Sequence, residues 1–186
     1  SELERLEERV RRIEEEVKRL LEEHREVSDR VAKENRRSNE ESKREVRRIE
    51  EEVKDLSRKG GDDRRRILEE VKRLVRELEK LLEEDITKSR KSVEDVRKHA
   101  EELLRTVRKL VRDLEKLLKE VLDRMGNSEE VKKVVEDVKR RLDDLIRKAE
   151  KVVRDSEREL KKLVDHSKEV VDRVRERLKE LIEEAR

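Results

Sequence analysis

The chain has 186 residues, of which 58% are charged and 31% hydrophobic, with no Pro, Cys or aromatic residue and only three Gly. The 55 Lys and Arg nearly balance the 53 Asp and Glu, and a net charge of +2 argues against a nucleic-acid binder, which needs a basic face. The lack of Cys excludes disulfide and thiol chemistry, and apolar residues never occur more than two in succession, which excludes a membrane span.

The first predicted helix covers residues 1–59 and opens on a capping box, Ser1 with Glu4. Such a charged composition is typical either of disorder or of long helices that pack along a narrow apolar seam. The apolar residues recur at steps of three and four, a period of about 3.5 residues, which favours helices in a left-handed coiled coil. Residues 33–45 contain no apolar residue. Alone they would indicate a linker, but in register with the other helices we expect them to be helical.

Two further helices are predicted over 63–125 and 128–185, after loops near 60–62 and 126–127. Each loop combines Gly, which suits a helix C-terminus, with Asp, Asn or Ser, which suit the next N-terminus. The helices have similar lengths of about 57–62 residues, and the connections are short. The fold class is therefore predicted to be all-α, an antiparallel up-down-up three-helix bundle that forms a single domain over 1–186.

Polar residues interrupt the apolar seam near the middle of every helix. In an antiparallel register His24 faces His99, which faces Ser156. Asn35 faces Ser89, which faces His166 and Ser167 in a second polar layer. Buried polar groups that face one another can form hydrogen-bond networks, and these specify register at some cost in stability. The predicted network comprises His24, Ser28, Asn35, Ser38, Ser42, Asp85, Ser89, Ser92, His99, Ser156, His166 and Ser167.

The His residues allow two interpretations: donors and acceptors that specify register, or a pH-responsive element whose burial opposes protonation. At most two His converge, whereas zinc needs three or four ligands, so no metal site is predicted. Ser156 beside His99 suggests a nucleophile and its base, but a continuous helix offers no oxyanion hole. We therefore predict no enzyme, no catalytic residue and no cofactor. Because Ser side chains are small, a water-filled cavity or a ligand site at the polar centre remains an alternative.

The second and third helices carry additional apolar residues beside the seam, such as Val75, Leu82 and Val153. If these residues point inward, the monomer is complete; if they point outward, they form a stripe that favours self-association. We expect a soluble monomer that requires no partner and binds neither nucleic acid nor membrane. A homo-oligomer and a missing partner helix are the alternatives.

Over its whole length the chain resembles de novo designed helical bundles, parametric three-helix coiled coils with buried hydrogen-bond networks. The features that carry the resemblance are the charged surface of LEERVRRIEEEVKRLLEE, the Gly-Gly-Asp-Asp and Gly-Asn-Ser loops, the absence of Pro and aromatic residues, and the polar layers. Natural spectrin-like three-helix repeats are less similar, because they usually carry aromatic core residues. The resemblance implies no natural biochemical function and a structural scaffold, with a designed binding or assembly module as the alternative.

Overall fold

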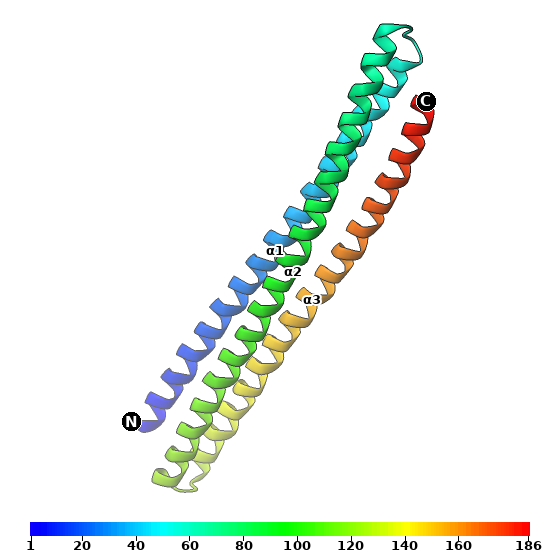
Figure 1. Ribbon diagram of the computed structural model, residues 1–186. Coiled ribbons are helices and arrows are strands. Elements are labelled where there is room, and N and C mark those ends of the chain that lie inside the picture. Colours follow the sequence, from blue (N-terminus) through cyan, green and yellow to red (C-terminus); the bar gives the residue numbers. More distant parts are fainter. The chain divides into compact units, whose positions relative to one another are not determined.

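The computed structural model describes all 186 residues and consists of three α-helices. They are α1 (Glu2–Leu56), α2 (Asp62–Met125) and α3 (Glu129–Ala185), with 55, 64 and 57 residues (Figure 1). Residues 33–45 are helical throughout, as the seam register predicted. None of the helices contains a stretch apolar and long enough to cross a membrane.

The helix ends follow the capping signals of the sequence to within one residue, except at the end of α1. Ser1 Oγ accepts a hydrogen bond from the Glu4 backbone N–H at 3.3 Å, and Ser128 Oγ accepts one from Val131 at 3.3 Å, so both Ser residues are N-caps. Gly126 has a φ of 76° at the end of α2, a left-handed conformation that favours Gly. At the first loop α1 ends at Leu56 rather than at residue 59. The backbone N–H groups of Ser57 and Arg58 then donate to the carbonyls three residues earlier, so the helix closes in a tighter turn before α2.

The contacts divide the chain into two compact units, each built from one part of every helix. Unit 1 comprises Ser1–Asp29 and Asp95–Arg158, and unit 2 comprises Arg30–Glu94 and Glu159–Arg186.

Cross-helix pairs give the helix directions within these units. In unit 1 α1 contacts α2 through Glu2 with Arg124 and through His24 with His99, so the partner number falls as the α1 number rises and the two helices are antiparallel.

Pairs between α1 and α3 keep a separation of 127 or 128 residues: Glu14 with Arg141 and Ser28 with Ser156 in unit 1, Asn39 with Ser167 and Glu50 with Arg177 in unit 2. Because the separation is constant, α1 and α3 are parallel in both units. The arrangement confirms the predicted up-down-up three-helix bundle.

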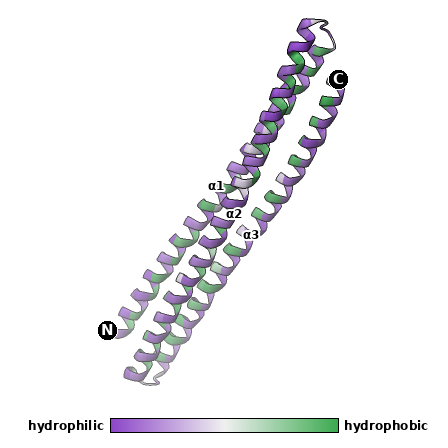
Figure 2. Ribbon diagram, in the orientation of Figure 1, coloured by the Kyte–Doolittle hydropathy of each residue, from purple (hydrophilic) through white to green (hydrophobic).

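Each unit has its own apolar core, and hydrophobic residues recur along all three helices (Figure 2). The fully buried residues include Leu114 and Leu142 in unit 1 and Ile49 and Leu178 in unit 2. The additional apolar residues of α2 and α3 are all buried or half-buried, so they point inward. Met125, 38% exposed, is the only large hydrophobic side chain on the surface.

Candidate functional site

A pair of imidazoles joins α1 to α2 in unit 1. The Nδ1 atoms of His24 and His99 lie 2.9 Å apart, and the rings stack with centroids 5.2 Å apart and planes 12° apart. In the neutral pair one Nδ1–H donates and the other Nδ1 accepts, since only one of the two facing nitrogens can carry the shared hydrogen. The hydrogen bond therefore requires that at least one of the two rings stay neutral.

The environment of His24 favours that neutral state. Its side chain is completely buried, and its second ring nitrogen, Nε2, has no hydrogen-bond partner. Burial lowers the pKa of His24, and the neighbouring His99 lowers it further. An imidazolium at this position would have neither water nor a carboxylate to stabilise its charge.

A pair of hydroxyls joins α1 to α3 in the same unit. Ser156 Oγ donates to Ser28 Oγ at 2.8 Å, and both residues are buried. The sequence placed Ser156 in one layer with the two imidazoles, but its hydroxyl uses Ser28 as its partner instead. No nucleophile–base contact is therefore formed between Ser156 and His99. We call His24, Ser28, His99 and Ser156 the His layer.

The second polar group lies in unit 2. Asn39 Nδ2 donates to Ser167 Oγ at 3.3 Å, which joins α1 to α3, whereas Ser42 Oγ donates within α1 to the Ser38 carbonyl at 3.0 Å. Asn35, Asn39 and Ser42 are buried, and the remaining members are half-buried. We call this group the Asn/Ser layer: Asn35, Ser38, Asn39, Ser42, Asp85, Ser89, Ser92 and Ser167.

Two residues of this region differ from the sequence prediction. His166 is exposed and lies outside the layer, because one residue turns a helix by about 100° and the seam position belongs to Ser167. Asn39 was not predicted, because the seam was drawn through Ser38 and Ser42. Once the structure pairs Ser28 with Ser156, the same separation of 128 residues leads from Asn39 to Ser167.

The Asn/Ser layer is only partly satisfied by protein groups. Asn35 Nδ2 and Asp85 Oδ2 are both buried without a hydrogen-bond partner. Burial raises the pKa of Asp85, and the charge of Glu41 raises it further, while Lys88 acts in the opposite direction. This carboxyl group therefore gains a proton more readily than an exposed Asp does.

We expect a Ser-to-Val substitution to have opposite effects on the free energy of unfolding in the two layers. Ser42→Val is expected to raise the free energy of unfolding by about 1 kcal/mol, because it adds buried apolar surface and removes a hydroxyl that bonds only within its own helix. Ser28→Val is the matched control. It should lower the same quantity by about 1–3 kcal/mol, because it leaves the Ser156 hydroxyl buried without its cross-helix partner. Chemical denaturation followed by circular dichroism measures both, and equal effects would contradict the assignment.

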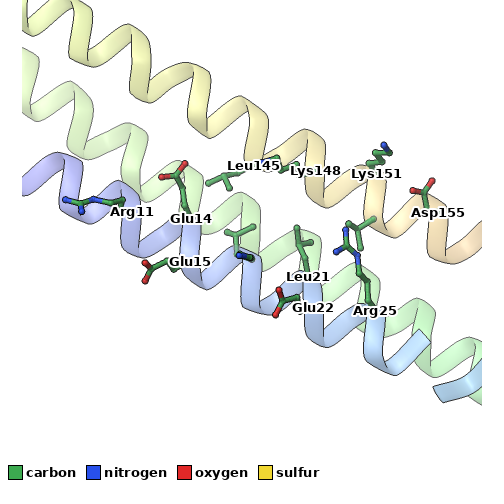
Figure 3. Close-up of a pocket in the computed structure, with 13 residues that line it drawn as sticks. Arg11, Glu14, Glu15, Leu21, Glu22, Arg25, Leu145, Lys148, Lys151 and Asp155 are labelled. Atoms are coloured by element: carbon green, nitrogen blue, oxygen red, sulfur yellow. The ribbon is translucent and has the colours of Figure 1, made fainter. Parts of the chain in front are cut away.

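A groove of about 640 Å³ lies between α1 and α3 in unit 1 (Figure 3). Apolar side chains such as Val17 and Leu145 line it, but none of the apolar lining residues is more than 7% exposed. The charged residues of its walls nearly balance; they are Arg11, Lys18, Arg25, Lys148 and Lys151 against Glu14, Glu15, Glu22 and Asp155. A guest would gain little apolar burial or net charge attraction there, so this groove is a solvated helix seam.

One ion pair in each unit ties α1 to α3 beside these features. Arg141 donates two hydrogen bonds to the Glu14 carboxylate, and Arg177 Nε donates to Glu50 at 3.1 Å. The remaining ion pairs are mostly exposed contacts three or four residues apart along one helix. The structure contains no group of three or more His, Cys, Asp or Glu residues arranged to hold a metal ion.

Comparison with known proteins supports this architecture. A solved structure described as "Computationally designed three helix bundle" is 24% identical in sequence, with a TM-score of 0.57 over 99% of this chain and 87% of that chain. This chain has the fold of a designed three-helix bundle. No protein-family model and no curated protein sequence matches it. At this identity the likeness establishes the fold of the bundle, and its function has to be argued from the polar layers.

Proposed function

We propose that the bundle is a structural scaffold whose buried polar layers fix the register and topology of its helices. The observation that carries the proposal is the His layer. Its two side-chain hydrogen bonds join residues 75 and 128 positions apart in the sequence, and apolar residues fill the rest of the unit 1 core.

Apolar layers alone distinguish registers poorly, because Leu and Val recur at every heptad. If α1 slid by seven residues, His99 would face Val17 or Val31 in place of His24. Each buried polar group left without a partner costs about 1–3 kcal/mol. The His layer contributes four residues with such groups, so a slipped register would be disfavoured by several kcal/mol even if its apolar contacts were as good.

Engineered disulfides test the proposal, because the chain contains no Cys of its own. Glu14→Cys with Arg141→Cys marks the native register, since these side chains are hydrogen-bonded. Glu14→Cys with Lys148→Cys marks a slip of one heptad, because Lys148 lies about 10 Å farther along α3. In the parent background the first pair should oxidise faster than the second, because its Cα atoms lie closer together and a disulfide closes only when they approach within about 7 Å.

The decisive background carries His24→Leu, Ser28→Val, His99→Leu and Ser156→Val together. There we expect the slipped pair to cross-link as well, while circular dichroism stays helical. If the native pair alone still cross-links, with the selectivity of the parent, then loops and apolar packing set the register and the proposal is wrong.

We further propose that the scaffold is a monomer. Its support is the burial of the additional apolar residues of α2 and α3, which leaves Met125 as the only exposed large hydrophobic side chain. Light scattering at micromolar concentration is expected to give the mass of one chain, 22.6 kDa. A mass of two or three chains would favour the assembly module instead.

A second candidate function is an acid-responsive scaffold. The observation that favours it is the environment of His24, which is fully buried, faces another imidazole and has a lowered pKa. Protonating both rings would replace a hydrogen bond by repulsion between two cations. This candidate differs from the first in one measurable respect: titration of the His pair must cause the pH dependence of the free energy of unfolding.

A further inference from the structure

Two hollows in unit 2 share four polar residues. One is a small inner cavity of about 50 Å³ lined by all three helices, and the other is an outer groove of about 580 Å³ lined by α1 and α2. Asn35, Ser38, Asp85 and Ser89 line both of them. We call these four residues the polar partition, because each of them lines both hollows.

The partition holds one donor and one acceptor without a partner. Asn35 is 7% exposed, and its Nδ2 has no hydrogen-bond partner. Asp85 Oδ2 is likewise buried and unpartnered. In folded proteins such buried groups are nearly always satisfied, by ordered water or by a ligand where the protein offers no partner.

The volumes of the two hollows and the charges around them limit the size and charge of a guest at the polar partition. A single water needs at least about 10–15 Å³, so the inner cavity has room for roughly one to three waters. The outer groove has the volume of a site for a small molecule. Its remaining charged groups, Glu34 and Glu41 against Arg37 and Lys88, balance one another. Asp85 adds one acceptor and Asn35 one donor, and this pairing favours a neutral guest that can both accept and donate a hydrogen bond.

We propose that the polar partition binds a neutral guest that bears a hydroxyl group. Its oxygen accepts a hydrogen bond from Asn35 Nδ2, and its O–H donates to Asp85 Oδ2. The hydroxyls of Ser38 and Ser89 can donate or accept, and so complete the remaining hydrogen bonds of the guest. Water and a small polyol such as glycerol share this chemistry, and the two sources are separable by experiment.

The composition of the chain provides the probe. It has no Gln, and its only side-chain amides are Asn35, Asn39 and Asn127, so a nitrogen–proton correlation spectrum contains three NH₂ pairs. Asn127 lies in the exposed loop before α3 and serves as the internal control. Without additive, we expect the Asn35 NH₂ group to show a nuclear Overhauser effect to a long-lived water, whereas Asn127 shows none. In a glycerol titration we expect a saturable shift of Asn35 and no saturable shift of Asn127.

The two arms identify the source of the hydroxyl. The water effect without a saturable glycerol shift assigns the site to water, and a saturable glycerol shift assigns it to a polyol. Absence of both signals overturns the proposal.

Variants at the partition and beside it show whether the signals arise at this site. Asp85→Ala removes the acceptor and should abolish the water effect or weaken glycerol binding about tenfold, the loss expected for one hydrogen bond to a charged group. Thr87→Ala is the matched control, because the Thr87 hydroxyl bonds within α2 and lines neither hollow, and it should retain both signals. Asp85→Asn keeps an acceptor oxygen without the charge and should retain more of both signals than Asp85→Ala, with circular dichroism confirming that each variant is folded. Unchanged signals in Asp85→Ala would overturn the proposal.

Discussion

Leu142→Ala is expected to lower the free energy of unfolding by about 2–5 kcal/mol. Leu142 is 1% exposed within the apolar core of unit 1, so truncation removes its packing contacts and leaves a cavity. Denaturant titration at neutral pH, followed by circular dichroism, measures the loss. Met125→Ala is the control: this side chain is 38% exposed, and its truncation should change stability by no more than about 0.5 kcal/mol.

Leu178→Ala makes the equivalent change in the core of unit 2. Hydrogen exchange read by mass spectrometry should show that each substitution lowers protection mainly in the unit that carries it. If Leu142→Ala cost no more than Met125→Ala, the apolar core would not be the main source of stability.

Acidification is expected to destabilise the bundle through its His pair. Because the pKa of His24 is lowered in the folded state, the unfolded chain binds more protons once the pH falls below about 6.5. Stability should therefore be flat above about pH 7 and fall as the pH drops through the unfolded pKa toward the lower folded one. One such group contributes a slope of at most about 1.4 kcal/mol per pH unit, which denaturation midpoints between about pH 7.5 and 4.5 resolve.

Two His variants separate this effect from the titration of the many surface carboxylates. His24→Asn with His99→Asn removes the facing imidazoles and should flatten the pH dependence near the His pKa. His166→Asn removes an exposed imidazole and should reproduce the parent curve. Parallel losses in the parent and the double variant would show that the pair is not a pH-sensing element.

The fold was predictable because its signals are local and repeated. The period of about 3.5 residues specifies the seam at every turn, and the only Gly residues lie in the two loops, at Gly60, Gly61 and Gly126. Short loops then leave antiparallel packing of neighbouring helices as the simplest arrangement. The end of α1 was placed three residues too late, since the final residues before Gly60 carry no apolar side chain that would reveal where packing stops.

For the polar site, the sequence predicted which residues face each other but not which of them form hydrogen bonds. Antiparallel register brought His24 to His99 without knowledge of any side-chain conformation. It could not decide that Ser156 bonds Ser28, because that depends on rotamers within a layer. The antiparallel register was also uncertain by one residue, which corresponds to about 100° of helix rotation. This uncertainty is enough to include exposed His166 and to omit buried Asn39.

The constant separation of 127 or 128 residues between α1 and α3 has a consequence for changing the length of the protein. Removing seven residues from one helix alone would displace every later residue by a heptad relative to its partners. Asn39 would then lose Ser167, or Ser28 would lose Ser156. Removing one facing heptad from all three helices preserves these partnerships. The protein can therefore be shortened or extended in whole heptads, provided that all three helices change together.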